Sequence, residues 1–283
     1  MHDAHGSGLI LGGGGVTGIA WELGLLMGLA DAGVELWSAD VVVGTSAGSV
    51  VGAQITGSTS LTELYQRQLE PPSAELPARL TARDQLAYAI AFVASRGDLS
   101  AFGRRLGAWS IQAADAGGLP TVGQRLAVIE SRLPSSDWPE RDLRVTVVDA
   151  HTGEFRIITG PDGVALADAV AASCAVPGVF PPIPIEGRLY VDGGVRSSAN
   201  ADVARGCSKV VVLAPLVRGF GAARSPQRQV DRLGVPSVVI APDRGSRAAI
   251  GKNVLDPAGR RGAAEAGLAQ ATRAVAQVRR VWG

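Results

Sequence analysis

The stretch Asp40 to Ser49, with the sequence DVVVGTSAGS, constrains the fold of this chain more than any other. Its three valines are β-branched and favour a buried strand, whereas the run that follows from Ser49 to Ile55 suits a helix. Residues 44–48 must therefore form a tight turn between a strand and a helix. Such a unit is typical of α/β proteins, in which helices alternate with parallel strands.

Ser46 stands at the apex of this turn, with Gly44 and Gly48 two positions away on either side. Glycines there keep Cβ atoms out of a crowded corner and leave the serine hydroxyl at the N-terminus of a helix. Free N–H groups and the helix dipole favour negative charge at that position. Ser46 is therefore a candidate nucleophile. The alternative is a polar turn in which Ser46 or Ser49 only caps the helix, and this short motif alone does not separate the two.

A glycine loop, Gly12 to Gly18, joins a short apolar strand at residues 8–11 to a helical stretch, Ile19 to Ala30. The pattern Gly13-x-Gly15-x-x-Gly18 formally matches the dinucleotide-binding fingerprint, which also needs an acidic residue at the end of the second strand. This chain has GTS there. The N–H groups of the loop can instead form an oxyanion hole, because the loop and Ser46 are expected to meet at the carboxyl edge of a parallel sheet.

Residues 57–139 show helical periodicity interrupted by prolines and glycines. We expect this segment to be a mostly helical cap inserted into a single domain that spans residues 1–283. The apolar side chains of the cap either form a surface over a lipid-like substrate or pack on the sheet. The expected helices are Leu61 to Leu69, Asp84 to Ser95, Leu99 to Ala114 and Thr121 to Leu133, and the apolar residues are Leu86, Ile90, Phe92, Val93, Phe102, Leu106, Trp109 and Ile111.

The second half of the chain alternates short strands with helices and ends in an Ala-rich stretch of helical spacing. The expected strands are Leu143 to Asp149, its hairpin partner Glu154 to Ile158, Leu189 to Asp192, Lys209 to Pro215 and Pro236 to Pro242. A helix is expected at Leu166 to Ala175, a polar loop at Gly219 to Arg232 and a long closing helix at Arg261 to Trp282.

Two residues are candidate bases for a serine nucleophile. His151 is the one histidine beyond the first five residues, so a serine, histidine and aspartate triad would need it. A histidine in a hairpin turn is, however, more often a solvent-exposed turn residue without a catalytic role. Asp192 ends a strand in an Asp-Gly-Gly turn. It either caps its own backbone or serves as the base that this histidine-poor chain otherwise lacks.

Charge, the N-terminal residues and the cysteines argue against a nucleic-acid binder, a secreted protein and a membrane-spanning protein. The net charge is +1 and 19% of residues are charged, so the chain lacks the footprint of a nucleic-acid binder. The N-terminus does not read as a secretory signal, and no run approaches the length of a membrane span. Cys174 and Cys207 lack metal-ligand spacing and fit a reducing compartment. We therefore expect a cytoplasmic protein whose membrane contact, if it makes any, is peripheral.

Four pieces of the sequence together resemble the patatin-like phospholipase family: the Gly12 to Gly18 loop, GTSAG at residues 44–48, the segment from Ala172 to Pro182, and Asp192-Gly193-Gly194. They occur in that family's order and with similar spacing. The resemblance covers roughly residues 8–55 and 143–214 and leaves the cap unmatched. It implies a patatin-like α/β fold with a mostly parallel central sheet flanked by helices.

The same resemblance implies a lipid acyl hydrolase, which is a phospholipase, lipase or esterase acting on carboxylic esters. Ser46 is then the nucleophile, Asp192 accepts its proton directly, and N–H groups of Gly13, Gly14 and Gly15 stabilise the oxyanion. The implied reaction needs no metal or cofactor. Water or another alcohol can resolve the acyl-serine, so a transacylase is included.

Two departures from the family pattern limit what carries over. Thr17 stands where the family usually has Arg or Lys, so a charge beside the glycine loop is missing. The common Asn-x-Pro is also absent after Gly194. Two alternatives stay open: a catalytically silent lipid-binding member of the family, and a dinucleotide-binding protein that uses the Gly13 to Gly18 loop.

Overall fold

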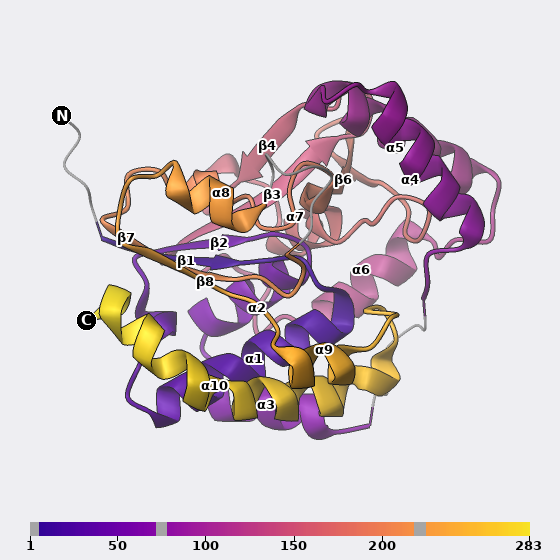
Figure 1. The fold of residues 1–283 in the computed structure, drawn as a ribbon. Coiled ribbons are helices and arrows are strands. Elements are labelled where there is room, and N and C mark those ends of the chain that lie inside the picture. Colours follow the sequence, from indigo (N-terminus) through magenta and orange to yellow (C-terminus); the bar gives the residue numbers. More distant parts are fainter. Residues whose placement is uncertain (1–5, 72–77, 218–224) are drawn as a thin grey trace.

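One mixed sheet forms the centre of the molecule (Figure 1). The computed structural model describes residues 6–71, 78–217 and 225–283. The strands in these ranges are β1 (Ser7–Leu11), β2 (Val41–Gly44), β3 (Asp142–Asp149), β4 (Phe155–Ile158), β5 (Ile183–Ile185), β6 (Arg188–Asp192), β7 (Lys209–Leu213) and β8 (Ser237–Ile240).

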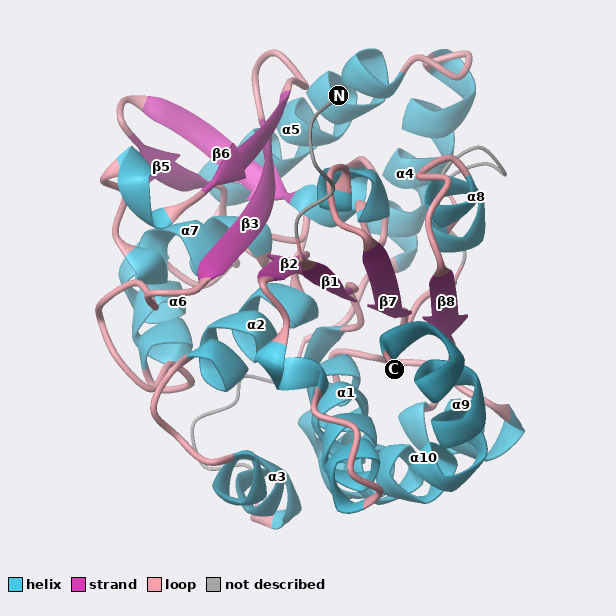
Figure 2. Cartoon of the chain, turned by 90° about the vertical axis from the view of Figure 1, so that its left-hand side faces the viewer, coloured by secondary structure: helices cyan, strands magenta, loops and turns pink. Residues whose placement is uncertain are grey.

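The strand order in the described residues is β5-β6-β3-β2-β1-β7-β8, with β4 paired to β3 outside this path. Strands β3, β2, β1, β7 and β8 are parallel to one another, whereas β4 and β6 run antiparallel to β3. Figure 2 shows β5 and β6 at one end of the sheet and β8 at the other. The expected α/β class with a mostly parallel central sheet is confirmed.

Helices cover both faces of this sheet. They are α1 (Gly15–Asp31), α2 (Ala47–Thr56), α3 (Leu61–Leu69), α4 (Ala82–Ala94), α5 (Leu99–Asp115), α6 (Val122–Glu130), α7 (Leu166–Ser173), α8 (Pro226–Asp231), α9 (Arg244–Ile250) and α10 (Arg260–Trp282). Helices α1, α2, α7 and α10 pack on one face, and α8 and the α4–α5 pair lie on the other side (Figure 1). No helix in the described ranges is long and apolar enough to cross a bilayer.

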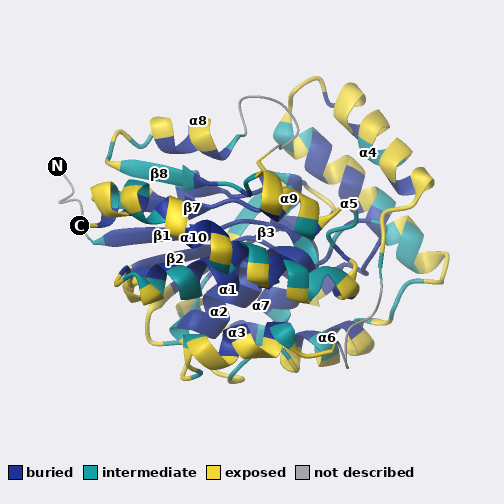
Figure 3. Ribbon diagram, turned by 60° about the horizontal axis from the view of Figure 1, so that its bottom comes forward, coloured by how far each residue is buried: buried dark blue, intermediate teal, exposed yellow. Residues whose placement is uncertain are grey.

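Alternation along the strands explains why both faces are covered. In β1, Leu9 and Leu11 belong to the core beneath α1 and α2, whereas Ile10 belongs to a second core on the opposite face. Val42 and Val43 in β2 divide in the same way. Successive side chains of a strand point to opposite faces, so a strand that is apolar throughout needs cover on both sides. Figure 3 shows the resulting buried interior.

The segment 57–139 contains α3 to α6, which lie in three places. Helix α3 contacts α1 and α10, the α4–α5 pair lies beside β3 and β6, and α6 packs on α7. The interpretation of this segment as one cap in a single domain stays a prediction. In the expected polar loop Gly219 to Arg232, residues 219–224 lie outside the described ranges. The expectation is wrong for the rest, where Ser225 caps the short helix α8.

Candidate active site

Ser46 lies between β2 and α2 in a conformation that is rare for a residue with a side chain. Its φ is 52° and its ψ is −118°, a backbone geometry that costs energy and recurs at functional sites. The Ser46 N–H donates to Ser173 Oγ over 2.9 Å. A Cβ atom on Gly48 would lie 2.0 Å from the carbonyl oxygen of Leu11, so glycine is required where the turn crosses β1.

Asp192 lies at the end of β6, which pairs with β3 next to β2. Its side chain is 5% exposed, and Oδ1 accepts a 2.7 Å hydrogen bond from the Gly194 N–H. Burial raises the pKa of Asp192 to about 6, against the opposing effects of a hydrogen bond from the Ser46 side chain, the Gly194 N–H and the charge of Arg125. The strand order therefore brings Ser46 and a desolvated carboxyl group together.

A buried polar cluster connects the two turns that carry Ser46 and Asp192. Thr45 Oγ1 and Thr146 Oγ1 are 2.8 Å apart, and Asn200 Nδ2 donates to both hydroxyls and to the carbonyl oxygen of Gly193. Asn200, Thr45 and Thr146 are completely buried. Buried hydrogen bonds of this kind hold backbone positions strictly, because a lost partner leaves a polar group unsatisfied.

The glycine loop presents two N–H groups that have no acceptor within the described part of the chain. Gly12 donates to Leu213 O and to Glu22 Oε1, each over 2.9 Å, and Gly13 donates to Ser198 O over 2.7 Å. Gly14 and Gly15 make no such bond, and both line the cavity that Ser46 and Asp192 share. These two donors therefore belong to residues in the wall of the cavity that also contains the candidate nucleophile.

An apolar cavity of about 510 Å³ reaches Ser46, Asp192 and the glycine loop. Its apolar walls come from α4 and the residues before it, from the segment after α7, from the turn after β6 and from loops that follow β7 and α9: Leu80, Tyr88, Ala89, Phe92, Val176, Pro177, Val195, Leu216, Val254 and Leu255. Burial and the charge of Asp192 raise the pKa of the Tyr88 hydroxyl, so this side chain is a neutral part of the wall. A cavity with this lining suits an aliphatic chain.

The eight apolar residues expected to form a substrate surface divide into different roles. Phe92 lines the cavity, Phe102 and Leu106 pack in a core against β3 and β6, Ile111 packs partly buried against that core, and Trp109 donates to Asp84. Three others, Leu86, Ile90 and Val93, are exposed on the outer side of α4. Propensity could not separate these roles, because all eight have the same periodicity along their helices.

His151, the alternative base, lies in the exposed turn between β3 and β4. Its N–H donates to Asp149 Oδ1, as expected for turn chemistry, and it is not among the residues that line the cavity. Thr17, which replaces a basic residue of the family pattern, is completely buried, and its hydroxyl donates to Val254 O.

Three residues near the site were not found from the sequence. Asn200 lies in a stretch of small polar residues with no spacing signal, and its partners lie far away in the chain. Arg125 lies on α6 and Arg132 just after it, and both line a small space next to Ser46. Single arginines in or just after a helix have no local pattern that would mark them, so only tertiary structure reveals them.

The sequence matches the family model described as Patatin-like phospholipase over residues 9–205. The chain belongs to the patatin-like phospholipase family. The matched range contains the glycine loop, Ser46 and Asp192 of this patatin-like chain.

One curated protein and one solved structure are similar to this chain. The Patatin-like phospholipase domain-containing protein 7 of Rattus norvegicus is 26% identical over 208 residues, which are 73% of this chain and 13% of the rat protein. The crystal structure of VipD from Legionella pneumophila matches with a TM-score of 0.50 at 13% identity, covering 96% of this chain and 67% of VipD. The similarity to VipD concerns the fold alone.

Proposed function

We propose that this chain is a lipid acyl hydrolase that cleaves carboxylic esters through an acyl-Ser46 intermediate. The observation that carries the proposal is the pairing of Ser46, held at positive φ, with the buried Asp192 at the wall of an apolar cavity of about 510 Å³. Family membership supports the same reaction class.

In the proposed reaction, the ionised Asp192 takes the proton of the Ser46 hydroxyl while Oγ attacks the ester carbonyl carbon. The carbonyl oxygen becomes an oxyanion, and collapse of this intermediate breaks the bond to the alcohol, which receives the proton from Asp192. Water then attacks the acyl-serine and gives a proton to the same carboxylate. The bond between the acyl carbon and Ser46 Oγ breaks, Oγ takes that proton, and the free acid leaves. Burial makes Asp192 a stronger base than an ordinary aspartate, and a positioned base typically contributes about 10² to 10⁴ in rate. An alcohol in place of water would make the chain a transacylase.

The oxyanion hole of the proposal consists of the N–H groups of Gly14 and Gly15. Gly13 was expected to be a third donor, but its N–H donates to Ser198 O in this structure, so it would have to exchange that partner. Each oxyanion donor is worth on the order of 3 kcal/mol in the transition state.

The proposed substrate reaches the cavity from a lipid surface through contact with α4. Leu86, Ile90 and Val93 lie on the outer face of this helix and are 61%, 58% and 74% exposed. Phe92 and Leu80, beside them, line the cavity itself. An exposed apolar face of this kind suits the interface of a bilayer, where it is buried by a few ångströms. Membrane contact is therefore proposed as peripheral, and a cytoplasmic location stays a prediction.

The decisive experiment is labelling with a fluorophosphonate probe, which reports an activated serine beside an oxyanion hole. Wild type is expected to be labelled at Ser46, as located by mass spectrometry, whereas Ser46→Ala is not labelled and Asp192→Asn is labelled far more slowly. Ser58→Ala, which removes an exposed serine, is the matched control and keeps full labelling. Each variant is checked for native circular dichroism.

The alternatives give different results in the same samples. A silent lipid-binding member would bind an oleoyl lipid equally well as wild type and as Ser46→Ala, without labelling or hydrolysis. A dinucleotide-binding protein would bind a nicotinamide or flavin dinucleotide and lose that binding when the Gly13 to Gly18 loop is altered. Either outcome in folded protein would overturn the hydrolase proposal.

A further inference from the structure

Helix α1 contains a buried carboxyl group that takes no part in the proposed proton transfers. Glu22 is completely buried, and its Oε1 accepts a 2.9 Å hydrogen bond from the N–H of Gly12, the first residue of the glycine loop. Its second oxygen, Oε2, has no hydrogen-bond partner among the residues that the structure describes. Burial raises the pKa of Glu22 well above its ordinary value, and the bond from the Gly12 N–H opposes this effect. Burial therefore favours the neutral carboxyl group.

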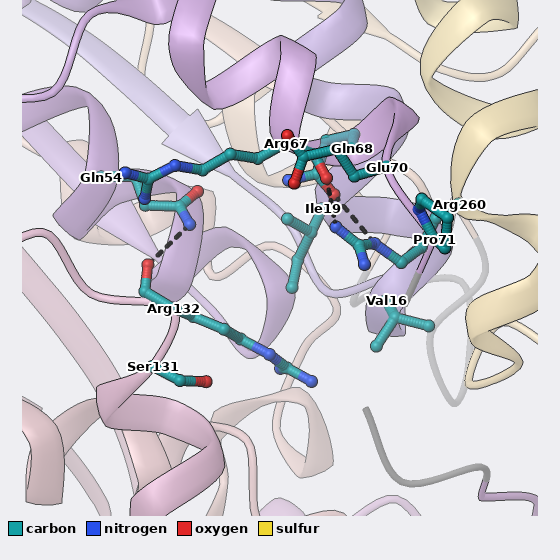
Figure 4. A pocket seen from close by; sticks show the side chains of 10 residues that line it. All are labelled: Val16, Ile19, Gln54, Arg67, Gln68, Glu70, Pro71, Ser131, Arg132 and Arg260. Atoms are coloured by element: carbon teal, nitrogen blue, oxygen red, sulfur yellow. Dashed lines mark hydrogen bonds between the residues drawn. The ribbon is translucent and has the colours of Figure 1, made fainter. Parts of the chain in front are cut away.

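The placement of Glu22 reverses the usual distribution of polar and apolar side chains along a helix. Val16 and Ile19, in the first turns of α1, line a cavity of about 410 Å³ whose other walls are mostly polar (Figure 4). Glu22, one turn after Ile19, is instead enclosed in the interior. Glutamate is almost never fully buried without a charged partner, because burial of its carboxyl group costs free energy. A residue that breaks this rule beside a candidate site indicates a role other than stability.

The Gly12 N–H does not depend on Glu22 for an acceptor. It also donates to Leu213 O over 2.9 Å, which continues the pairing of β1 with β7. Loss of the carboxyl group would therefore leave no unsatisfied backbone donor at this position. The bond to Glu22 is thus an additional restraint on Gly12 and not the replacement of a missing partner.

Gly12 connects Glu22 to both parts of the candidate site. Its carbonyl oxygen accepts a 3.0 Å hydrogen bond from the N–H of Gly48, in the turn that carries Ser46. Along the chain it is followed by three more glycines, residues 13–15, and the last two carry the proposed oxyanion donors. A glycine backbone has unusual conformational freedom, so a run of four glycines needs bonds from outside the loop to keep one geometry. Glu22 supplies one of these bonds from helix α1.

We propose that Glu22 is a positioning residue of the reaction: through the Gly12 N–H, it holds the glycine loop where the N–H groups of Gly14 and Gly15 meet the developing oxyanion. The inference rests on the proposed hydrolase function and adds a residue that does not touch the substrate. Because the oxyanion exists only after the nucleophile attacks, this restraint stabilises the transition state and not the bound ester. Its loss is therefore expected to lower kcat and to leave KM nearly unchanged.

Matched substitutions at two glutamates test this role. Glu22→Met keeps an unbranched side chain of similar length but has no oxygen to accept the Gly12 N–H, whereas Glu22→Gln keeps a carbonyl acceptor in a neutral group. Glu35→Met is the control, because it makes the same substitution at an exposed position beyond the other end of α1. Each protein is assayed with a soluble p-nitrophenyl ester and with a fluorophosphonate probe. Both the rate and the final extent of labelling at Ser46 are measured.

We expect Glu22→Met to slow the reaction without loss of folded protein. Misplacement of catalytic groups typically costs on the order of 10²-fold in rate, so its kcat is expected to fall about ten- to a hundredfold. The rate of labelling falls by the same factor, but the final extent equals that of wild type. Its midpoint of denaturant unfolding is expected to equal or exceed that of wild type, because an apolar group replaces a buried carboxyl group. Glu22→Gln restores kcat to near the wild-type value, and Glu35→Met matches wild type.

A purely structural role of Glu22 predicts different results. Glu22→Met would then unfold at a lower denaturant concentration, and fewer molecules would be labelled, at an unchanged rate. That outcome overturns the inference, as does an equal loss of kcat in Glu22→Gln and Glu22→Met. Glu22→Leu, which also lacks an acceptor, is the second variant should Glu22→Met not fold, and failure of both to fold would show that Glu22 acts on the fold alone.

Wild type itself separates this role from the hydrolase function. If wild type is labelled at Ser46 and hydrolyses the ester, but Glu22→Met does both at the same rate, the hydrolase stands and the role of Glu22 is overturned. If folded wild type is neither labelled nor active, the hydrolase function fails, and the positioning role fails with it.

Discussion

At the scale of single residues, the protonation of Asp192 makes the proposed mechanism measurable. Its pKa is raised to about 6 by burial, and only the ionised carboxylate can take the proton of Ser46. We therefore expect kcat/KM for a neutral soluble ester to rise with pH through about 6 and to level off above that value. An ordinary aspartate would place the rise near 4. A profile centred near 7 that disappears in His151→Ala would show that the wrong base had been chosen.

The same carboxyl is expected to lower stability at neutral pH. Its pKa is about 6 in the folded chain against an ordinary value of 3.8, so the folded state binds the proton more tightly than the unfolded state does. Proton binding by Asp192 therefore contributes fully to the free energy of unfolding below pH 3.8, and this contribution is lost as the pH rises through about 6. The difference corresponds to about 3 kcal/mol at pH 8.

Asp192→Asn removes this ionisation and can still accept the Gly194 N–H. We expect it to raise the free energy of unfolding at pH 8 by up to about 3 kcal/mol and to change it little near pH 4. Denaturant unfolding of both proteins at the two pH values measures the difference. A gain that is equal at both pH values, or a loss at pH 8, would contradict the account of Asp192 as a desolvated base.

Residues of the candidate site were predictable where their position follows from the strands. Ser46 and the glycine loop each follow an apolar strand, and parallel packing brings such ends to one edge. Asp192 ends the antiparallel strand β6, and it reaches the same region through the register that places it opposite Val147 of β3. The loss of Gly13 as a free donor was not predictable, because its acceptor, Ser198 O, belongs to a distant loop. The role of Asn200 was not predictable either. Its hydrogen bonds to Thr45 and Thr146 form only once β2 and β3 are paired.

At the scale of elements, most helices and strands were found from periodicity. Besides α8, the expectation missed β5 and α9, and both omissions have physical reasons. Strand β5 has three residues with Pro184 at its centre, and it is tolerated because it pairs on one side, at the edge of the sheet. Helix α9, with the sequence RGSRAAI, has no apolar stripe that would mark it. It begins where Asp243 caps it, and it packs on α10.

Helix α4 is the element whose surface best tests membrane contact. The triple variant Leu86→Ser, Ile90→Ser and Val93→Ser removes the exposed apolar face without touching the cavity wall. Because each side chain contributes apolar area to the bilayer interface, we expect at least about tenfold weaker binding to phosphatidylglycerol vesicles in a sedimentation assay. Hydrolysis of a soluble ester is expected to stay near that of wild type.

The control for this prediction is Ile157→Ser, which alters an apolar residue on β4 that is 37% exposed. It is expected to bind vesicles as wild type does. If the control weakens binding as much as a single α4 substitution, or if the triple variant binds normally, α4 is not the contact surface.

At the scale of the whole molecule, the last helix closes the fold against the first. Helix α10 lies along α1, whose N-terminus follows the glycine loop of the candidate site. The spacing of apolar residues predicted α10, but it did not predict that α10 packs on α1. A helix face rich in Ala and Gly does not indicate which element it contacts. The close approach is visible only in the structure, where glycines of each helix meet backbone atoms of the other.

Two glycines of α10 allow a matched test of this contact. A Cβ atom on Gly267 would lie 2.3 Å from the carbonyl oxygen of Trp21 in α1, so Gly267→Ala must push the two helices apart. We expect it to cost about 1–3 kcal/mol of unfolding free energy, as overpacking of a core does. A Cβ atom on Gly262 would meet nothing closer than 4.0 Å, so Gly262→Ala should gain about 0.5–1 kcal/mol from helix propensity.

Denaturant unfolding of the two variants beside wild type measures both effects. Because α1 begins at the glycine loop, Gly267→Ala is also expected to slow labelling of Ser46, while Gly262→Ala labels at the rate of wild type. The same substitution in the same helix would then have opposite effects on stability, according to whether the glycine faces α1. Equal shifts in the two variants would mean that helix propensity, and not the close packing of α10 on α1, sets the stability of this closing contact.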